Sequence, residues 1–517
     1  MSIWLALALP ALPLQLAQRA LDGALARSLA LAIVDGPAQR SQVLFCNDTA
    51  RSAGVTPGMK LAAAQALVRE LVALEYRAEQ EQAALQELAC WAYQFSSAIV
   101  PFHDGSASGI LVETGGSERL FGGRQALHRR IRGALRSLGY HASFAAAATP
   151  AAARLLAQAR ALQAAAPAAA ADLATVETAQ LPAALAPLPL QLLGWPPAGL
   201  QLLQSLGLAT IGDVLALPRD AFARRFGAMH LVELDRLLGS IADPQPPFAP
   251  PERFQARVEL PADLTDVAQL QTPLRHLLRL LEGFLRGRGA GATALVLRAH
   301  HNRRRDQPAA PTPIALALAL PERDAQRLER LFTERLARTS LPEPAVLLEL
   351  QLERMADFLP GNASFLPPAP DSAQWDTDAL HLAETLHARL GSAGVFQLQT
   401  VDDHRPELAY RVLPPGPGAP QRAATIALPA QRPVLILPAP QLLSRPAAAP
   451  GTPAHGAALT LLAGPERIEA GWWDLGYQSH PPVHRDYFVA RNPRGQTLWI
   501  YRELVAPHRW FLHGYFG

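Results

Sequence analysis

Carboxylate side chains are the first residues to look for, because the paired Mg²⁺ ions that hold a triphosphate need hard oxygen ligands. No Asp or Glu occurs before Asp22 in this chain. The opening segment from Ile3 to Pro10 is apolar, so we predict a strand that can pack but cannot hold magnesium. Near the later apolar run Ile110–Val112 the local acids are Asp104 and Glu113, with Glu118 farther along.

The composition predicts a multidomain protein without a membrane span. The 517 residues suffice for about three to five modules of roughly 100 to 200 residues each. Cys46 and Cys90 form no CxxC pair, so neither a zinc knuckle nor a disulfide framework is expected. The apolar opening lacks a basic leader and is broken by Pro10 and Pro13, and no uninterrupted apolar run of about 20 residues follows. We therefore expect a cytoplasmic protein.

The charge composition leaves the question of nucleic-acid binding open. The net charge is +3 and the sequence pI about 9.1, with Lys60 as the single lysine. Arginine suits phosphate contacts because its fork donates two parallel hydrogen bonds. A genome-wide coding bias toward Ala, Pro and Arg explains the same composition equally well.

Residues 1–160 alternate short apolar runs with amphipathic stretches, as α+β domains do. The run Ala145–Ala148 predicts a strand that passes into a helix at Thr149-Pro150. From Ala164 to Leu190 the chain is crowded with Ala and Pro, which is typical of a connection between domains.

Hydrophobic-Gly-hydrophobic turns follow, centred on Gly194, Gly207 and Gly212. Such turns between short helices let backbone amides approach a DNA phosphate, as in a helix-hairpin-helix motif. The alternative is an ordinary helical turn that ends in a glycine.

Residues 252–355 carry strand-like runs such as Ala294–Arg298 and a helical stretch from Leu274 to Leu285. Basic side chains are spread over these elements and would fit a sheet laid against a phosphate backbone: Arg275, Arg279, Arg286, Arg288, Arg298, Arg303, Arg304 and Arg305. The triplet Arg303–Arg305 is equally explained as an exposed turn. Beyond Met355 the chain becomes Pro-rich, and its last 50 residues are dense in aromatics, which predicts a small packed β-rich module.

Several of these segments resemble the Y-family DNA polymerases, in particular the ImuB branch of bacterial mutagenesis cassettes. The segment Asn47–Met59 is similar to the family's fingers signature, and Ser106–Thr114 followed by Arg119–Gly123 lies where active relatives carry Ser-x-Asp-Glu and Leu-Asp. The resemblance implies an α+β multidomain fold with palm, fingers, helix-hairpin-helix thumb and little finger, followed by a C-terminal β-rich module.

Aligned with active relatives, the metal-binding positions of this chain hold Ala8, Ser108 and Gly109, none of them acidic. Glu113 stands at the Leu-Asp position, and the helix from Thr149 to Ala157 offers alanines where relatives place a lysine. The resemblance therefore implies no catalytic residues, no bound metal and no cofactor. Asp104 and Glu113 are the local acids that would have to substitute.

The C-terminal part resembles ImuB itself. Its motifs follow the order of that family: Val401–Glu407, Arg432–Leu437, Gly471–Asp474, Arg485–Phe488, Leu498–Tyr501 and Trp510–Phe516. The resemblance implies an aromatic surface for protein partners, to which we assign Trp472, Trp473, Trp499 and Trp510. We give His404 and His513 no catalytic role.

Relatives reach the sliding clamp through a Gln-x-x-Leu-Phe-like peptide on the linker after the little finger. The candidate here consists of Asn362, Ser364, Phe365 and Leu366, with Asn in place of Gln. An apolar pair in a Pro-rich linker is just as often a local packing contact, and Gln441-Leu442-Leu443 is a weaker second candidate.

We predict the following domains: palm, 1–15 and 80–160; fingers, 16–79; thumb, 161–245; little finger, 250–355; linker, 356–375; and interaction region, 376–517. The resemblance implies a non-catalytic DNA-binding scaffold in translesion synthesis and DNA repair. Its partners would be DNA without sequence preference, the sliding clamp, an error-prone C-family DNA polymerase and the RecA-like ImuA. The alternatives are an active Y-family polymerase with displaced metal ligands and a damaged-DNA binder that does not use the clamp.

Overall fold

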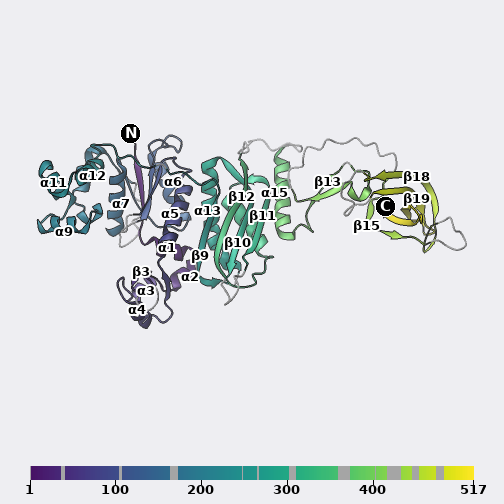
Figure 1. Cartoon of the computed structure of the whole chain (residues 1–517), viewed down its shortest axis with the longest axis horizontal. Coiled ribbons are helices and arrows are strands. Elements are labelled where there is room, and N and C mark those ends of the chain that lie inside the picture. Colours follow the sequence, from purple (N-terminus) through teal and green to yellow (C-terminus); the bar gives the residue numbers. More distant parts are fainter. Residues whose placement is uncertain are drawn as a thin grey trace. The chain divides into compact units, whose positions relative to one another are not determined.

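A computed structural model gives the architecture of residues 2–21, 23–36, 41–103, 108–163, 173–246, 248–264, 267–301, 310–358, 373–401, 403–415, 432–444, 453–472 and 482–517. The chain divides into two compact units, Met1–Asp371 and Ser372–Gly517 (Figure 1). No helix within these described segments is long and apolar enough to cross a bilayer.

The centre of the first unit is a five-stranded sheet with the order β5-β6-β1-β7-β8. Its strands are β1 (Trp4–Leu9), β5 (Ile99–His103), β6 (Ser108–Glu113), β7 (Ser143–Ala147) and β8 (Thr175–Val176). Strand β1 confirms the buried strand expected at the start of the chain, since Leu5 to Leu9 are all buried.

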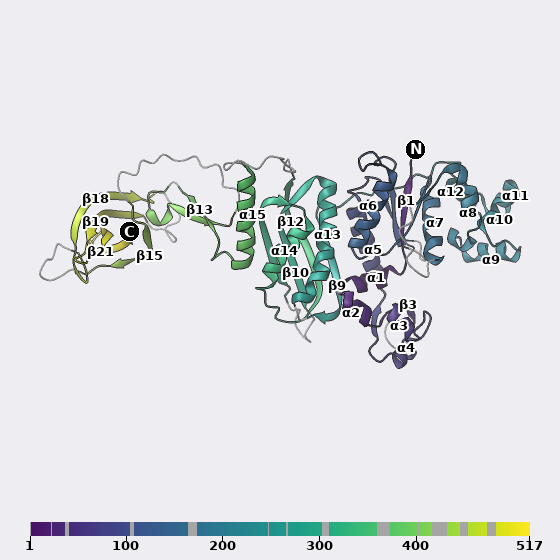
Figure 2. The ribbon, with the colours of Figure 1, turned by 180° about the vertical axis from the view of Figure 1, so that it is seen from behind.

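Helices cover both faces of this sheet. Figures 1 and 2 show α7 (Pro150–Gln163) on one side of β1, and α5 (Ala78–Ala92) and α6 (Arg124–Ser137) on the other. Ala6 and Ala8 belong to the same core cluster as the apolar side chains of α7. Small residues at these positions let α7 lie close to the strand. The strand-to-helix passage expected at Ala145–Pro150 is confirmed.

The segment between α1 (Leu12–Arg19) and α5 forms a small layer of its own. It contains α2 (Gly23–Ser28), α3 (Asp48–Ser52), α4 (Leu61–Leu67) and a sheet of β2 (Leu31–Val34), β3 (Val43–Cys46) and β4 (Val72–Glu75) in the order β3-β2-β4. Cys46 is a buried core residue in it, as Cys90 is in α5.

A helical region follows the central sheet. Its elements are η1 (Thr178–Gln180), α8 (Leu181–Leu185), η2 (Leu190–Leu193), α9 (Pro197–Ser205), α10 (Ile211–Leu215), α11 (Arg219–Phe226) and α12 (Ala228–Leu238). The expectation of a plain connection from Ala164 to Leu190 was therefore wrong for its second half. Leu181, Leu185 and Leu190 are buried in the core that also contains α7, and this burial stabilises short helices despite the nearby prolines.

The last part of the first unit is a four-stranded sheet, β11-β10-β12-β9, with two helices. The elements are β9 (Gln255–Leu264), η3 (Val267–Leu270), α13 (Gln271–Arg288), β10 (Ala290–His301), β11 (Thr312–Glu322), α14 (Ala325–Leu336) and β12 (Ala345–Asp357). The strand and helix expected at Ala294–Arg298 and Leu274–Leu285 are confirmed. Strand β12 continues to Asp357 and α15 begins at Ala373, so regular structure enters both ends of the expected 356–375 linker.

The second unit begins with α15 (Ala373–Leu390) and the hairpin of β13 (Gln397–Thr400) and β14 (Tyr410–Leu413), with η4 (Pro406–Leu408) between the strands. Its main sheet has the order β15-β21-β20-β19-β18. The strands are β15 (Leu435–Leu442), β18 (Thr460–Ala470), β19 (Val483–Arg491), β20 (Thr497–Glu503) and β21 (Trp510–Tyr515), and a small pair is formed by β16 (Ala454–His455) and β17 (Ala457–Ala458). The β-rich character expected from the terminal aromatics is confirmed.

Helix α13 packs tightly against the end of α5 because it carries glycine at the contact. A Cβ atom added at Gly283 would lie 2.5 Å from Trp91 Cδ1 and 2.8 Å from Gln94 Nε2. One at Gly287 would lie 3.2 Å from Tyr93 Cδ1. The four-stranded layer is therefore seated on the central layer through a contact that excludes even a methyl group.

We predict that Gly283→Ala lowers the free energy of unfolding by about 1–3 kcal/mol, because the overpacked contact outweighs the gain in helix propensity. The control is Gly133→Ala in α6, where an added Cβ meets nothing within 4 Å. This control should be neutral or stabilising by up to about 1 kcal/mol. Urea unfolding measures both, and equal effects at the two sites would contradict the tight packing of α13 on α5.

Candidate functional site

The positions that carry metal ligands in active relatives meet where β1 pairs with β6. In the antiparallel register Ala8 lies opposite Gly109, and Leu9 lies opposite Ser108. Ala8 is 1% exposed and sits beneath α7. The structure thus brings Ala8, Ser108 and Gly109 together as the alignment expected, and none of the three supplies a carboxylate.

Gly109 has no room for a side chain. A Cβ atom added there would clash with the backbone oxygen of Leu7 and would lie 2.6 Å from Phe102 Cζ. The ring of Phe102, on the neighbouring strand β5, fills the space into which a carboxylate at this position would project. An acid at residue 109 therefore requires both the strand and the ring to move.

Ser108 is buried and joins a polar cluster on the α5 side of the sheet. Its hydroxyl donates to Glu81 Oε1 and lies 2.9 Å from His103 Nδ1. Tyr76 donates its hydroxyl to the other Glu81 oxygen at 2.9 Å. Burial and the bond to Glu81 raise the pKa of Tyr76.

Glu81 corrects the expectation that Asp104 and Glu113 were the local acids to consider. It lies 27 residues before Ser108 in the sequence, on α5, and no motif in the sequence marks it. Only the packing of α5 against β5 and β6 brings it to the strand. Asp104 lies outside the described residues.

Glu113 is engaged at the opposite end of the strand pair. It lies opposite Trp4, four residues from the Ala8–Gly109 pair, which is about 13 Å along a strand. Its carboxylate accepts hydrogen bonds from the backbone N–H groups of Ile3 at 3.2 Å, Gly115 at 2.9 Å and Gly116 at 3.2 Å. Glu113 therefore fixes a turn and lies too far away to complete a cation site at Ala8.

Among the residues that the structure describes, no three His, Cys, Asp or Glu side chains form a group able to hold a metal ion. The two-magnesium chemistry of active relatives does not fit the residues at the β1–β6 site. Its three key positions carry no carboxylate, and both oxygens of the nearby Glu81 already accept hydrogen bonds, from Ser108 and Tyr76.

Helix α7 contains no lysine, but it carries the cation of Arg154. Arg154 lines a cavity of about 280 Å³ between α7 and α12, together with Arg236 and Asp243. Trp195 donates its indole N–H to Glu233 at 2.6 Å in the wall of the same cavity. The alanines expected on this helix are present at residues 151–153, and Arg154 follows them directly.

The three glycines of the expected helix-hairpin-helix motif use their own amides internally. Gly194 N–H donates to Gln191 O at 3.3 Å, Gly207 N–H to Gln204 O at 2.9 Å and Gly212 N–H to Ala186 O at 3.0 Å. Gly194 and Gly207 have positive φ and end η2 and α9, whereas Gly212 lets α10 approach α8 closely. For Gly194 and Gly207 this geometry matches the alternative of ordinary glycine-terminated turns.

The open face of the four-stranded sheet is organised around Glu349, which is buried. Its carboxylate accepts hydrogen bonds from Gln255 and from Gln351, and it lies 2.8 Å from His300 Nε2. Burial alone would raise the pKa of Glu349, but the His300 bond and the Arg257 charge outweigh it and lower the pKa. Arg298 donates to Gln351, and so belongs to this network.

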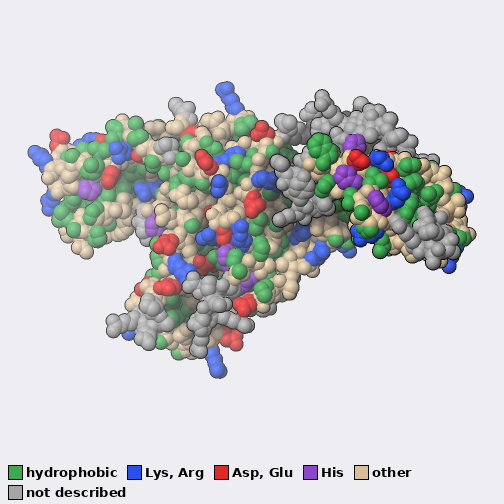
Figure 3. Space-filling model, turned by 45° about the vertical axis from the view of Figure 1, so that its right-hand side comes forward, with side chains coloured by type: hydrophobic (Ala, Val, Ile, Leu, Met, Phe, Trp, Pro, Cys, Tyr) green, Lys and Arg blue, Asp and Glu red, His purple; other side chains and the backbone are tan. Residues whose placement is uncertain are grey.

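The other predicted DNA contacts, Arg303, Arg304 and Arg305, lie outside the described residues. Figure 3 shows basic and acidic side chains interspersed on the face in view. This mixing agrees with ion pairs in the first unit such as Arg275–Glu329 and Arg77–Glu259.

The aromatic residues assigned to partner binding fall into two groups. Trp499 and Trp510 are 1% and 6% exposed and belong to the two core clusters of the β15–β21 sheet. Their burial means that they hold the module together and offer no surface to a partner. Trp472 is 68% exposed, and Trp473 lies outside the described residues.

The candidate clamp peptide, with Asn362, Ser364, Phe365 and Leu366, also lies outside the described residues. The second candidate falls on strand β15. Leu442 is 63% exposed there, whereas the next residue, Leu443, is 6% exposed and packs in the module core.

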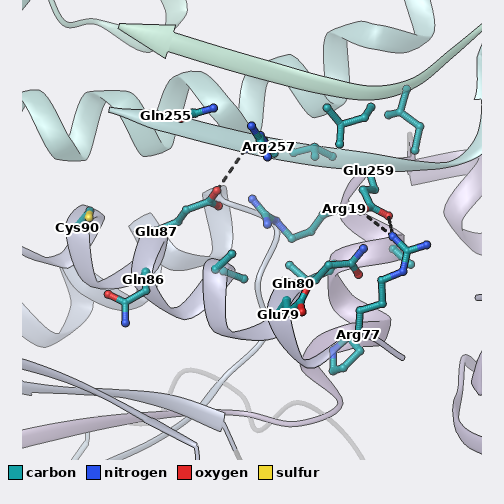
Figure 4. Close-up of a pocket in the computed structure, with 18 of the residues that line it drawn as sticks. Arg19, Arg77, Glu79, Gln80, Gln86, Glu87, Cys90, Gln255, Arg257 and Glu259 are labelled. Carbon is teal, nitrogen blue, oxygen red and sulfur yellow. Dashed lines mark hydrogen bonds and ion pairs between the residues drawn. The ribbon is translucent and has the colours of Figure 1, made fainter. Parts of the chain in front are cut away.

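A cavity of about 770 Å³ separates α1 and α5 from β9 (Figure 4). Arg19 is 5% exposed and donates through Nε to Leu138 O at 2.6 Å. Glu87 accepts from the backbone N–H of Arg257 at 3.2 Å, so it ties α5 to the edge strand β9. Burial raises the pKa of Glu87 to about 7, although the Arg257 amide and the Arg19 charge oppose the shift.

Comparison with known proteins identifies the chain. Residues 14–158 match the impB/mucB/samB family. Protein ImuB of Caulobacter vibrioides is 31% identical over 487 residues, which cover 90% of this chain and 100% of that protein, and the ImuB sequence of a second strain matches equally.

The chain belongs to the ImuB family. Among solved structures, DinB from Sulfolobus solfataricus aligns over 68% of this chain and 98% of its own, with a TM-score of 0.36 and 15% identity. A Dbh ternary complex aligns over the same shares with a TM-score of 0.36 and 14% identity. The α+β polymerase-type architecture with an added C-terminal β-rich module is confirmed. Membership of the family gives the chain a role in the ImuB-type mutagenesis system, in translesion synthesis after DNA damage.

We predict that Glu87 makes the protein less stable as the pH rises from about 4.5 to 7. In this window the folded state binds more protons at Glu87 than the unfolded state does, so the free energy of unfolding falls with rising pH. Urea unfolding at pH 5 and pH 8 measures the loss, and Glu87→Gln should reduce it by about 1–3 kcal/mol. Glu79→Gln, an exposed acid on the same helix, should leave the loss unchanged. An unchanged loss in Glu87→Gln would show that this carboxyl titrates normally.

Proposed function

We propose that this ImuB-family chain is a non-catalytic, polymerase-shaped scaffold that binds DNA without sequence preference during translesion synthesis. The observation that supports this most directly is the β1–β6 register. It pairs Ala8 with Gly109 and leaves the space beside Gly109 to the ring of Phe102. Nucleotide addition by a polymerase needs two cations held by carboxylate oxygens, and Ala8, Ser108 and Gly109 supply no carboxylate.

The scaffold would connect three protein partners: the sliding clamp, an error-prone C-family DNA polymerase and the RecA-like ImuA. An exposed Trp472 on the C-terminal module supports a protein contact there, because large exposed aromatics are favourable anchors. The clamp contact would use the peptide with Asn362, Ser364, Phe365 and Leu366. Because the scaffold would bind DNA, we propose that the protein is cytoplasmic and associated with the nucleoid.

An active polymerase remains the second candidate, and Glu81 is the observation that favours it. Its carboxylate accepts from Ser108 and therefore stands beside one of the vacated ligand positions. Against this candidate, both Glu81 oxygens already accept hydrogen bonds, from Tyr76 and Ser108, and His103 Nδ1 lies 3.9 Å from Oε1. A single carboxylate supplies too few oxygen ligands to hold two Mg²⁺ ions by itself.

We expect highly purified protein to incorporate no nucleotide in primer extension with Mg²⁺ or Mn²⁺. Incorporation that disappears in Glu81→Gln, Asp104→Ala or Glu113→Ala would overturn the scaffold and name the displaced ligand. Glu79→Gln is the matched control for loss of an acid on α5. The triple change Ala8→Asp, Ser108→Asp and Gly109→Glu should not restore activity, because the Gly109 space is closed.

We expect the full chain to be captured by immobilised sliding clamp, and capture to fall at least tenfold with Phe365→Ala and Leu366→Ala. The apolar pair would supply the plug of the contact, and each buried large side chain contributes about 1.5–3 kcal/mol. Leu382→Ala on α15, where the leucine is 61% exposed, is the control for an exposed leucine outside both candidate peptides. Undiminished capture of the double variant would remove this peptide as the clamp contact, and absence of any capture would favour a DNA binder that does not use the clamp.

A further inference from the structure

Arg19 is a buried cation that forms no ion pair with the carboxylates of the described residues. Its side chain is held at three points. Nε donates to Leu138 O at 2.6 Å, Nη1 donates to the hydroxyl of Tyr140, and the guanidinium carbon lies 3.8 Å from the centroid of the Tyr140 ring. The remaining nitrogen, Nη2, is buried and has no hydrogen-bond partner in the described part of the chain. One end of the guanidinium is therefore left to donate to a ligand.

A buried charge of this kind favours a bound anion. Taking a guanidinium out of water is unfavourable, and a counter-ion in good geometry offsets the loss, so buried arginines are usually paired. The contacts with Leu138 and Tyr140 keep Arg19 from turning outward to solvent. The cation is thus fixed in position before any ligand arrives, which lowers the entropy lost on binding.

Arg19 lines the cavity of about 770 Å³ that α1, α5 and β9 enclose. In Figure 4 its side chain extends toward Glu87. Sites for small molecules have volumes of roughly 300 to 1,000 Å³ and mostly apolar walls. Apolar side chains from five elements contribute to this wall: Leu16, Ile33, Leu74, Phe254 and Phe284. The cavity therefore combines a fixed cation with space for an apolar body.

The other charges around the cavity favour a ligand with one negative charge over a ligand with two. Four acids line it: Glu75, Glu79, Glu87 and Glu259. Arg77 pairs with Glu259 at 3.2 Å, and Arg257 pairs with Glu349 at 3.5 Å. Arg253 is exposed. A phosphate dianion would meet these acids around Arg19, whereas a carboxylate brings the one charge that Arg19 can neutralise.

Glu87 provides a second polar group for such a ligand. It accepts from the backbone N–H of Arg257 at 3.2 Å, and burial raises its pKa to about 7. The carboxyl therefore carries its proton below neutral pH and can then donate to a ligand oxygen. A dianion would gain less there, because its charge also repels the ionised form of Glu87.

We propose that this cavity binds a small monocarboxylate with an apolar body, and that its carboxylate accepts a hydrogen bond from Arg19 Nη2. The described lining residues do not include Ala8, Ser108 or Gly109, so the site is separate from the β1–β6 positions. The inference goes beyond the proposed function and does not rest on it. Since α1 and α5 form one wall and β9 the other, a bound ligand would contact both the central layer and the four-stranded layer.

The test is binding of a defined probe to the full chain, without DNA or clamp, followed by saturation-transfer NMR at pH 6. The probe is 4-phenylbutyrate, which has one carboxylate and an apolar ring. We expect it to bind with a Kd of about 1 mM or below. The matched uncharged molecule is 4-phenylbutanol, and inorganic phosphate is the anion without an apolar body. Both should bind at least tenfold more weakly.

Two variants locate the probe. Arg19→Gln should weaken binding ten- to a hundredfold, as expected when a hydrogen bond to a charged group is lost. Ala83→Trp fills the cavity from α5 and leaves Arg19 in place, so it should abolish binding. The control is Ala63→Trp, at an exposed alanine of α4 that does not line the cavity, and it should bind as the unaltered chain does. Circular dichroism checks the fold, and Ala83→Trp decides the question if Arg19→Gln does not fold.

Four outcomes would overturn the site as proposed. They are absence of probe binding to the unaltered chain, equal binding of 4-phenylbutanol, unchanged probe binding in Ala83→Trp, and unchanged probe binding in a folded Arg19→Gln. Inorganic phosphate that binds more tightly than the probe, and is lost in Arg19→Gln, would reject the carboxylate in favour of a phosphate ligand. None of these results affects the DNA-binding scaffold, because the titration contains no DNA.

Discussion

The pairing of β1 with β6 is the constraint on which the chemistry of the first unit depends. Residues opposite each other in an antiparallel pair share a face of the sheet, so the register decides which side chains meet. Here it brings Ala8 to Gly109 and gives the remaining space to Phe102 and α7. The positions without carboxylates are thus closely packed and form a stable part of the core.

The two acids near this strand pair, Glu81 and Glu113, have different roles. Glu81 reaches Ser108 from α5 and is satisfied by Ser108 and Tyr76, whereas Glu113 holds the turn after β6. An acid whose two oxygens both accept hydrogen bonds from protein donors contributes to the fold and is a poor cation ligand, since releasing it leaves those donors without partners. Two further carboxylates connect elements of the fold in the same way. Glu87 links α5 to β9, and Glu349 links residues of the four-stranded sheet.

In the C-terminal module, ion pairs and aromatic residues likewise stabilise the fold. Glu407 on η4 pairs with Arg485 at 2.9 Å, and Arg405 pairs with Asp403 at 2.8 Å. Gly471 leaves the space that Arg405 occupies. The rings of Tyr487 and Trp499 stack in the same module, with their centroids 4.2 Å apart. The ordered motifs of the module are therefore first of all its internal contacts, and its partner surface must be sought in exposed residues such as Trp472.

The sequence by itself determined the resemblance, the order of the segments and the types of element, because motif spacing and hydrophobic periodicity are local properties. It also determined that Ala8, Ser108 and Gly109 carry no acid. Only the tertiary structure decided which residues surround them. Glu81 and Phe102 come from other elements, the amides of Gly194, Gly207 and Gly212 turn inward, and Trp499 and Trp510 are buried. Burial and hydrogen bonding depend on residues distant in the sequence, so no local pattern could assign them.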